Sequence, residues 1–98
     1  MRFVAIFEDG VDPADHPAAL NQAHFRYLAD HADRIVLCGG LRPDQGQPFL
    51  GALWIIEAPD REAATALVKA DPYSLAGLWT HVRVMAWGKA PHLGAVTL

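Results

Sequence analysis

The sequence predicts an α+β fold with four strands and two helices in the order β-α-β-β-α-β. Three observations lead to this expectation: β-branched and aromatic runs that stop at turn residues, two segments with apolar residues at helical spacing, and helix-start signals before each of them. The chain has 98 residues, the size of a single domain. The order is typical of the ferredoxin-like fold, a four-stranded antiparallel sheet with two helices on one face.

The first half of the chain supplies two strands and one helix. Phe3–Phe7 is the first strand, because its β-branched and aromatic run stops at an acidic turn that contains Gly10. A helix is expected from about residue 17 to residue 32, where the apolar positions follow helical spacing. The short apolar run Ile35–Cys38 is the second strand, and Gly39-Gly40 is interpreted as the turn that ends it.

The second half supplies the remaining elements. Strand three is expected at Leu50–Glu57, after a polar loop, and a long strand four at Trp79–Trp87. Between them, Asp60 is a helix N-cap, and the helix ends near Ala70 because the residue before Pro72 disfavours helical angles. Residues 89–98 are expected to form an extended arm of the same single domain, residues 1–98.

Composition excludes several classes of partner. The net charge is −3, and the eight Lys and Arg are spread along the chain, which argues against binding to nucleic acid or to anionic membranes. No apolar run reaches the roughly 20 residues of a membrane span, and the chain opens on strand-like residues, so we expect a cytoplasmic protein. The single Cys38 cannot form an internal disulfide, and its apolar neighbours predict a buried thiol without a chemical role.

The predicted strands are apolar on both faces. In the first strand, Phe3 and Phe7 alternate with Val4 and Ile6, and 52% of the whole chain is hydrophobic. Two helices cover only one face of such a sheet, and large exposed apolar patches are rare on monomers. We therefore expect two chains to pack their sheets together in a homodimer. The alternative is that the second face carries scattered exposed apolar groups.

His24 is the first candidate for chemistry. It lies four residues after Leu20 and four before Leu28, hence on or beside the buried face of the first helix. A histidine in that position either finds a hydrogen-bond partner in the core or lines a pocket. His31 lies nearer the helix end, where an imidazole suits a capping role.

Asp71 and Tyr73 follow the second helix. Asp followed by Pro is a good N-cap for a short helical turn at residues 72–75, so Asp71 could have a purely structural role as this cap. Its functional interpretation is a carboxylate that orients a nearby histidine. Tyr73 could offer its phenol to a substrate in the same pocket, or it could be a packing residue.

His81 and Arg83 share one face of strand four, so they point toward the expected dimer interface or a substrate cavity within it. No His or Cys spacing is typical of a metal site, and Gly39-Gly40 lacks a phosphate-binding fingerprint. We therefore expect neither a metal nor a cofactor.

Three segments together resemble the YciI-like family over nearly the whole chain: Gln22–Leu28, Ala70–Tyr73 and Trp79–Val84. The resemblance implies a ferredoxin-like α+β fold, a dimer with apposed sheets, and a pocket in which the helix histidine and the Asp-Pro-Tyr aspartate form a dyad. His24 and Asp71 occupy those positions. One activity that the family implies is a dehydrochlorinase that acts on a chlorinated hydroxyquinol.

Two functions follow. The first is a cofactor-independent enzyme, a lyase or a related acid-base catalyst of a small, cyclic or aromatic molecule, with His24 as general base or acid and Asp71 orienting it. The second is a non-catalytic module that binds a small ligand or assists another enzyme, since no nucleophile or metal completes the site.

Overall fold

The structure is a computed structural model that describes residues 1–10, 12–79 and 81–95. Its elements follow the predicted order, with a 3-10 turn, η1, before the first helix and a short helix, α3, after the second. The bounds are β1 (Arg2–Glu8), η1 (Pro13–Asp15), α1 (Ala18–Asp30), β2 (Ile35–Leu41), β3 (Gly51–Glu57), α2 (Arg61–Lys69), α3 (Pro72–Leu75) and β4 (His81–Ala86).

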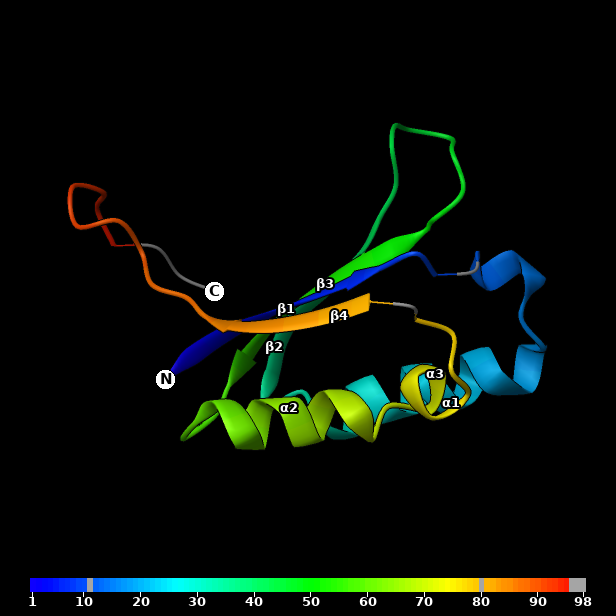
Figure 1. Ribbon diagram of the computed structural model, residues 1–98, viewed down its shortest axis with the longest axis horizontal. Helices are drawn as coiled ribbons and strands as arrows, with labels where there is room; N and C mark the ends of the chain where they lie inside the picture. The colour runs from blue at the N-terminus through cyan, green and yellow to red at the C-terminus, as the bar shows by residue number, and fades with distance from the viewer. Residues whose placement is uncertain (11, 80, 96–98) are drawn as a thin grey trace.

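The four strands form one antiparallel sheet in the order β2-β3-β1-β4. Figure 1 shows α1, α2 and α3 together on one side of this sheet, with the other side left without helices. The α+β fold that the sequence predicts is thereby confirmed. Asp60 is the N-cap of α2, as predicted, and its carboxylate accepts a hydrogen bond from the Ala63 amide at 2.8 Å.

The second strand is longer than predicted. The expectation that Gly39-Gly40 is a strand-end turn is wrong, because both glycines pair with β3 and the strand continues to Leu41. A register shift between Ile35 and Leu37 marks a β-bulge. A bulge inserts one residue without a partner and thereby changes which side chains face each layer. The first helix is two residues shorter at its C-terminal end than expected, and Thr80, at the predicted start of the fourth strand, lies outside the described residues.

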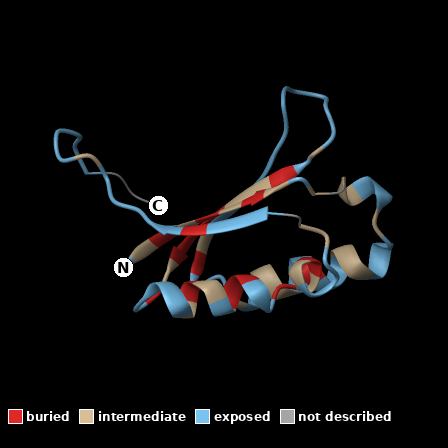
Figure 2. Cartoon of the chain, in the orientation of Figure 1, coloured by how far each residue is buried: buried red, intermediate tan, exposed pale blue. Residues whose placement is uncertain are grey.

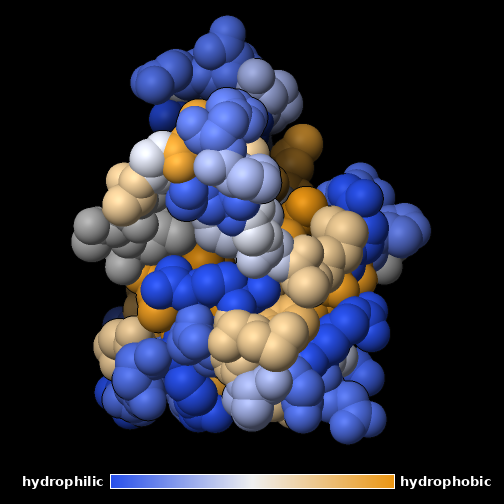
Figure 3. All heavy atoms as spheres, turned by 90° about the vertical axis from the view of Figure 1, so that its left-hand side faces the viewer, coloured by the Kyte–Doolittle hydropathy of each residue, from blue (hydrophilic) through white to orange (hydrophobic). Residues whose placement is uncertain are grey.

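The core lies between the sheet and the helices. Figure 2 shows the buried residues gathered where these two layers face each other. Trp54, Phe3, Phe7 and Ile56 are its largest fully buried apolar side chains, and the Phe7 and Trp54 rings lie 4.8 Å apart between centroids. Seen from the end of the sheet where β1 begins, hydrophobic residues show mainly at mid-height, and hydrophilic residues dominate the upper and lower ends of the view (Figure 3).

The opposite face of the sheet is apolar at its centre. The strand register places Val4 between Ile55 and Met85, and Ile55 pairs with Leu37. Of these, Met85 is 41% and Leu37 51% exposed. Ion pairs such as Arg2–Glu57 border this face. We call it the outer face of the sheet.

Two further features complete the chain. After β4 the backbone leaves the sheet as an arm (Figure 1), in which Lys89 donates a hydrogen bond to the Leu93 carbonyl. The predicted arm continues into residues 96–98, which lie outside the described part. Within the described residues, no helix is long and apolar enough to cross a membrane.

Candidate active site

A cavity of about 460 Å³ opens between the helix layer and the half of the sheet formed by β2 and β3. Helix α1 supplies His24, Phe25 and Leu28 to its wall. The remaining lining residues are mostly aromatic or small: Pro13, Cys38, Gly39, Gly40, Phe49, Gly51, Ala52, Trp54, Tyr73 and Trp79. This volume is within the range of small-molecule sites, and an apolar wall with few polar groups is typical of them.

Glycine shapes one wall of this cavity. A Cβ at Gly40 would lie 2.5 Å from the Phe49 ring, so the missing side chain lets that ring lie against the strand. The Arg42 guanidinium covers the Phe49 ring at 4.7 Å from the centroid, a cation–π contact. The loop between β2 and β3 therefore contributes one aromatic wall.

His24 and Asp71 meet at this cavity. The His24 Nδ1 lies 2.6 Å from Asp71 Oδ1, although 47 residues separate them. Asp71 is fully buried, and His24 is the one buried residue of α1. Because a carboxylate accepts, Nδ1 carries the proton of this bond, so in a neutral ring the lone pair is on Nε2. Nε2 has no hydrogen-bond partner among the described residues, which leaves it free to meet a ligand.

Asp71 occupies the N-cap position of α3 without capping it. Its side chain makes no hydrogen bond to the first turn of α3. The backbone of Asp71 is therefore at the predicted N-cap position, but its carboxylate does not cap the helix. Oδ1 is engaged by His24, and Oδ2 has no partner in the described structure. A buried carboxylate is costly unless it is paired, so the imidazole is its main compensation.

Tyr73 holds the other side of the imidazole. Its ring stacks on His24 with centroids 3.7 Å apart and planes within 9°. The phenol donates a hydrogen bond to Asn21 Oδ1 at 2.5 Å, and Asn21 in turn donates to the Pro13 carbonyl at 2.9 Å. His16 lies 3.1 Å from the same Asn21 oxygen. The tyrosine thereby fixes the ring plane of His24 and is itself held from α1 and η1.

Two tyrosines near Asp71 resist ionisation. Burial raises the pKa of Tyr73, and the Asp71 carboxylate raises it further because a second negative charge would be repelled. Burial and Asp71 also raise the pKa of Tyr27, partly opposed by Arg34. Tyr27 donates to the Leu67 carbonyl at 2.5 Å and so joins α1 to α2.

We expect the protein to lose stability in alkali through these two phenols. With raised pKa values, the folded chain binds the phenolic protons more tightly than the unfolded chain. The free energy of unfolding should therefore fall as pH rises above 10.0, the ordinary tyrosine pKa. Urea unfolding at about pH 9 and about pH 11 measures this fall, and the Tyr27→Phe and Tyr73→Phe double variant should show a smaller one. An identical fall in both proteins would contradict the assignment.

The structure places the other predicted residues away from the dyad. His81 and Arg83 lie on the outer face near the turn after β1, and they are exposed. His81 lies 3.0 Å from Asp9, and Arg83 donates to Glu8. Neither lines the cavity of a single chain, so their role toward substrate stays a prediction.

Other expectations had mixed outcomes. The expectation that Cys38 is buried is wrong: the residue is exposed and lines the cavity, where partial desolvation raises the pKa of its thiol. His31 is the C-cap of α1, as expected, and its Nδ1 lies 2.7 Å from the Tyr27 carbonyl.

Within the described ranges, no three His, Cys, Asp or Glu side chains are grouped as metal ligands would be.

Sequence reasoning missed several residues of the site. Asn21 lies three residues before His24, so helical spacing could have placed both on one face. The sequence predicts Trp54 and Trp79 as strand residues without a role in a pocket; Trp54 lies in β3, but Trp79 precedes β4, and both line the cavity. No local signal marked Phe49, which reaches the cavity from a loop.

Comparisons with known proteins agree with the motifs. A family model described as the YCII-related domain matches residues 1–88. Protein YciI from Escherichia coli O6:H1 is 32% identical over 96 residues, covering 91% of this chain and 98% of the relative, and Protein YciI from Shigella flexneri matches equally. The structure of 5-chloro-2-hydroxyhydroquinone dehydrochlorinase (TftG) from Burkholderia phenoliruptrix AC1100, in complex with 2,5-dihydroxybenzoquinone, matches with a TM-score of 0.73 and 25% identity. That match covers 94% of this chain and 98% of TftG. The chain belongs to the YCII-related domain family.

Proposed function

We propose that this protein is an enzyme that catalyses a proton transfer on a small cyclic molecule, with His24 as the acid-base group and Asp71 orienting it. One observation carries the proposal: the imidazole of His24 lines an apolar cavity and is held by a buried carboxylate 2.6 Å away. Histidine is the side chain most often used for proton transfer near neutral pH.

The surroundings of His24 favour catalysis over a packing role. Asp71 holds Nδ1, and Tyr73 holds the plane of the ring, so Nε2 points where a ligand would lie. An imidazolium formed by proton uptake is stabilised by the adjacent carboxylate. Binding in an apolar cavity also removes water from the reacting groups and strengthens electrostatic contacts.

The aromatic walls favour a planar substrate. Phe49, Trp54 and Trp79 offer ring surfaces to the cavity, and aromatic rings pack well against one another. TftG, a similar protein of known structure, is a 5-chloro-2-hydroxyhydroquinone dehydrochlorinase. Dehydrochlorination removes one proton and one chloride ion from the substrate. We extend this class of reaction to the present chain, with Nε2 of His24 as the proton acceptor.

Two measurements test the proposal. Wild-type protein should release chloride from 5-chloro-2-hydroxyhydroquinone faster than the uncatalysed reaction, and 2,5-dihydroxybenzoquinone should shift the NMR signals of His24 and Ala52. Binding of the quinone without chloride release would favour a non-catalytic binding module. If neither is observed, this substrate class is excluded and the acid-base role loses its support.

We also propose that the protein is a homodimer joined through the outer faces of two sheets. The outer face carries apolar residues at its centre and ion pairs at its border, and none of the described helices covers it (Figure 1). A partner sheet would remove the exposed parts of Met85 and Leu37 from water. His81 and Arg83 would then be within reach of the partner chain.

A charge on the outer face should separate the dimer. We expect Met85→Asp and Leu37→Asp to elute as monomers in size-exclusion chromatography with light scattering, whereas the wild type should show twice the 10.7 kDa of one chain. Both residues are exposed in a single chain, so each subunit should keep its fold. Leu75→Asp, on the helix side and 75% exposed, is the matched control and should leave the mass unchanged. A monomeric wild type would refute the dimer.

A further inference from the structure

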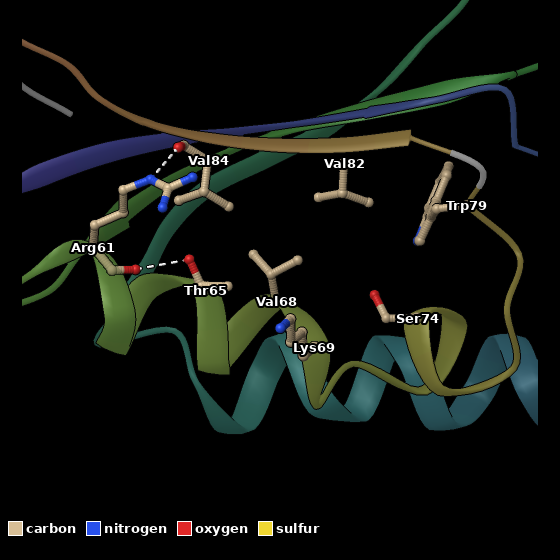
Figure 4. A pocket seen from close by; sticks show the side chains of 8 residues that line it. All are labelled: Arg61, Thr65, Val68, Lys69, Ser74, Trp79, Val82 and Val84. Atoms are coloured by element: carbon tan, nitrogen blue, oxygen red, sulfur yellow. Dashed lines mark hydrogen bonds between the residues drawn. The ribbon is translucent and has the colours of Figure 1, made fainter.

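A second, smaller pocket lies on the other half of the molecule, between α2, α3 and β4. Its volume is about 240 Å³, room for about eight water molecules at roughly 30 Å³ each. Figure 4 shows Val68, Val82 and Val84 on its apolar walls, with Arg61 at one end and Ser74 and Trp79 at the other. Trp79 also lines the cavity of the candidate active site, so this one residue borders both spaces.

Two buried polar groups that line this pocket lack hydrogen-bond partners in the described structure. The Ser74 hydroxyl and the Trp79 indole nitrogen are buried, and neither has a hydrogen-bond partner in the described structure. Buried polar groups without partners are uncommon in native proteins, because each costs free energy unless a water or a ligand meets it. An indole N–H can only donate, so whatever satisfies Trp79 has to be an acceptor.

Helix α2 adds positive charge to the same space. Arg61, Thr65 and Lys69 are spaced four residues apart and therefore lie on one face of the helix. The Arg61 Nε donates to the Val84 carbonyl at 2.7 Å, which fixes the side chain against β4 (Figure 4). Its two terminal nitrogens have no partner within the described part of the chain. The Lys69 ammonium has no partner among the described residues, and no carboxylate lines the pocket.

We propose that this pocket is a binding site for a small organic carboxylate, separate from the His24 cavity. The carboxylate accepts from Ser74 and Trp79, Lys69 and Arg61 supply the compensating charge, and the apolar body of the ligand lies along the three valines. The lining residues determine which ligand fits. Hydrogen-bond donors and cations favour binding of an anion, and the valine side chains favour an anion with an apolar body over an inorganic ion. The volume limits the body to about the size of one ring.

Benzoate is the probe, with benzamide as its neutral match of similar shape. In methyl NMR of the complete chain, benzoate should produce saturable shifts at Val82 and Val84, which line only the small pocket, while the Ala52 methyl of the His24 cavity reports separate binding there. Benzamide should bind about tenfold more weakly, because it lacks the charge that the donors and cations recognise.

Variants assign the binding to the named groups. Lys69→Gln should weaken benzoate binding about fivefold to tenfold and leave benzamide binding nearly unchanged, because only the carboxylate is charged. Ser74→Ala should weaken benzoate binding by a similar factor and benzamide binding less, because the amide carbonyl is the weaker acceptor. Lys89→Gln, a lysine of the C-terminal arm, is the matched control and should bind like the wild type. Lys69 is exposed, so its replacement does not disturb the core. Shifts only at Ala52, no saturable shift at the valines, or equal affinity for benzoate and benzamide would each overturn the proposal.

Discussion

Replacement of His24 by alanine is expected to lower chloride release from 5-chloro-2-hydroxyhydroquinone about a hundredfold to ten-thousandfold, the usual contribution of a general acid-base group. The variant keeps the cavity and loses the only imidazole that lines it among the residues that the structure describes. Loss of the ring also leaves the fully buried Asp71 without its partner, so some stability should be lost as well. Circular dichroism and a thermal unfolding curve would separate loss of chemistry from loss of fold.

Two further variants sharpen this test. His24→Gln keeps a polar side chain near Asp71 but cannot act as an imidazole base, so it should be as inactive as the alanine variant while disturbing the fold less. His92→Ala removes an exposed histidine of the arm and should retain full activity. Turnover by His24→Gln at the wild-type rate would show that His24 is a structural residue.

Replacement of Trp54 by alanine is expected to lower the free energy of unfolding by about 3–5 kcal/mol. Trp54 is 2% exposed, packs against Phe7 and pairs with Ala5 at the centre of the sheet. The truncated side chain would join the space it leaves to the existing cavity, so neighbouring residues cannot easily close it. For a chain of 98 residues, the melting temperature should fall by at least about 12 °C.

Leu75→Ala is the control for this prediction. Leu75 is 75% exposed on α3, and its truncation should change the free energy of unfolding by no more than about 0.5 kcal/mol. Urea unfolding of both variants compares them directly. A loss of under about 1 kcal/mol for Trp54→Ala would mean that the site collapses and that the tryptophan is not a main support of the core.

The order of the elements could be predicted from the sequence because local chemistry decides it. The Asp60 cap, the proline that stops α2 and the apolar strands each act over a few residues. Alternation within β1 also predicts the two faces, and Phe3 and Phe7 are buried against the helices as that alternation requires. The glycines of β2 were the exception, because their pairing with β3 outweighs their weak intrinsic preference for strands.

The candidate site was less accessible to sequence reasoning. His24 and Asp71 are 47 residues apart, and only the arrangement of α1 against α3 brings them together. Spacing placed His24 beside the buried face of its helix but could not name its partner, so the pairing came from family resemblance. Cys38 is exposed although its neighbours are apolar, because it faces the helix layer where the cavity opens.

The bulge in β2 also affects the interior of the protein. Past the register shift, Cys38 and Gly40 face the helix layer opposite Trp54 and Ala52, and Leu37 and Leu41 point to the outer face. If Val36 paired with β3 and the strand had no bulge, Leu37 and Leu41 would turn inward and fill the space that now holds the cavity, whereas loss of Val36 itself would keep the present faces. The one extra residue of the bulge thus decides whether β2 turns small residues or two leucines toward the helices, and with that whether the interior is hollow or filled.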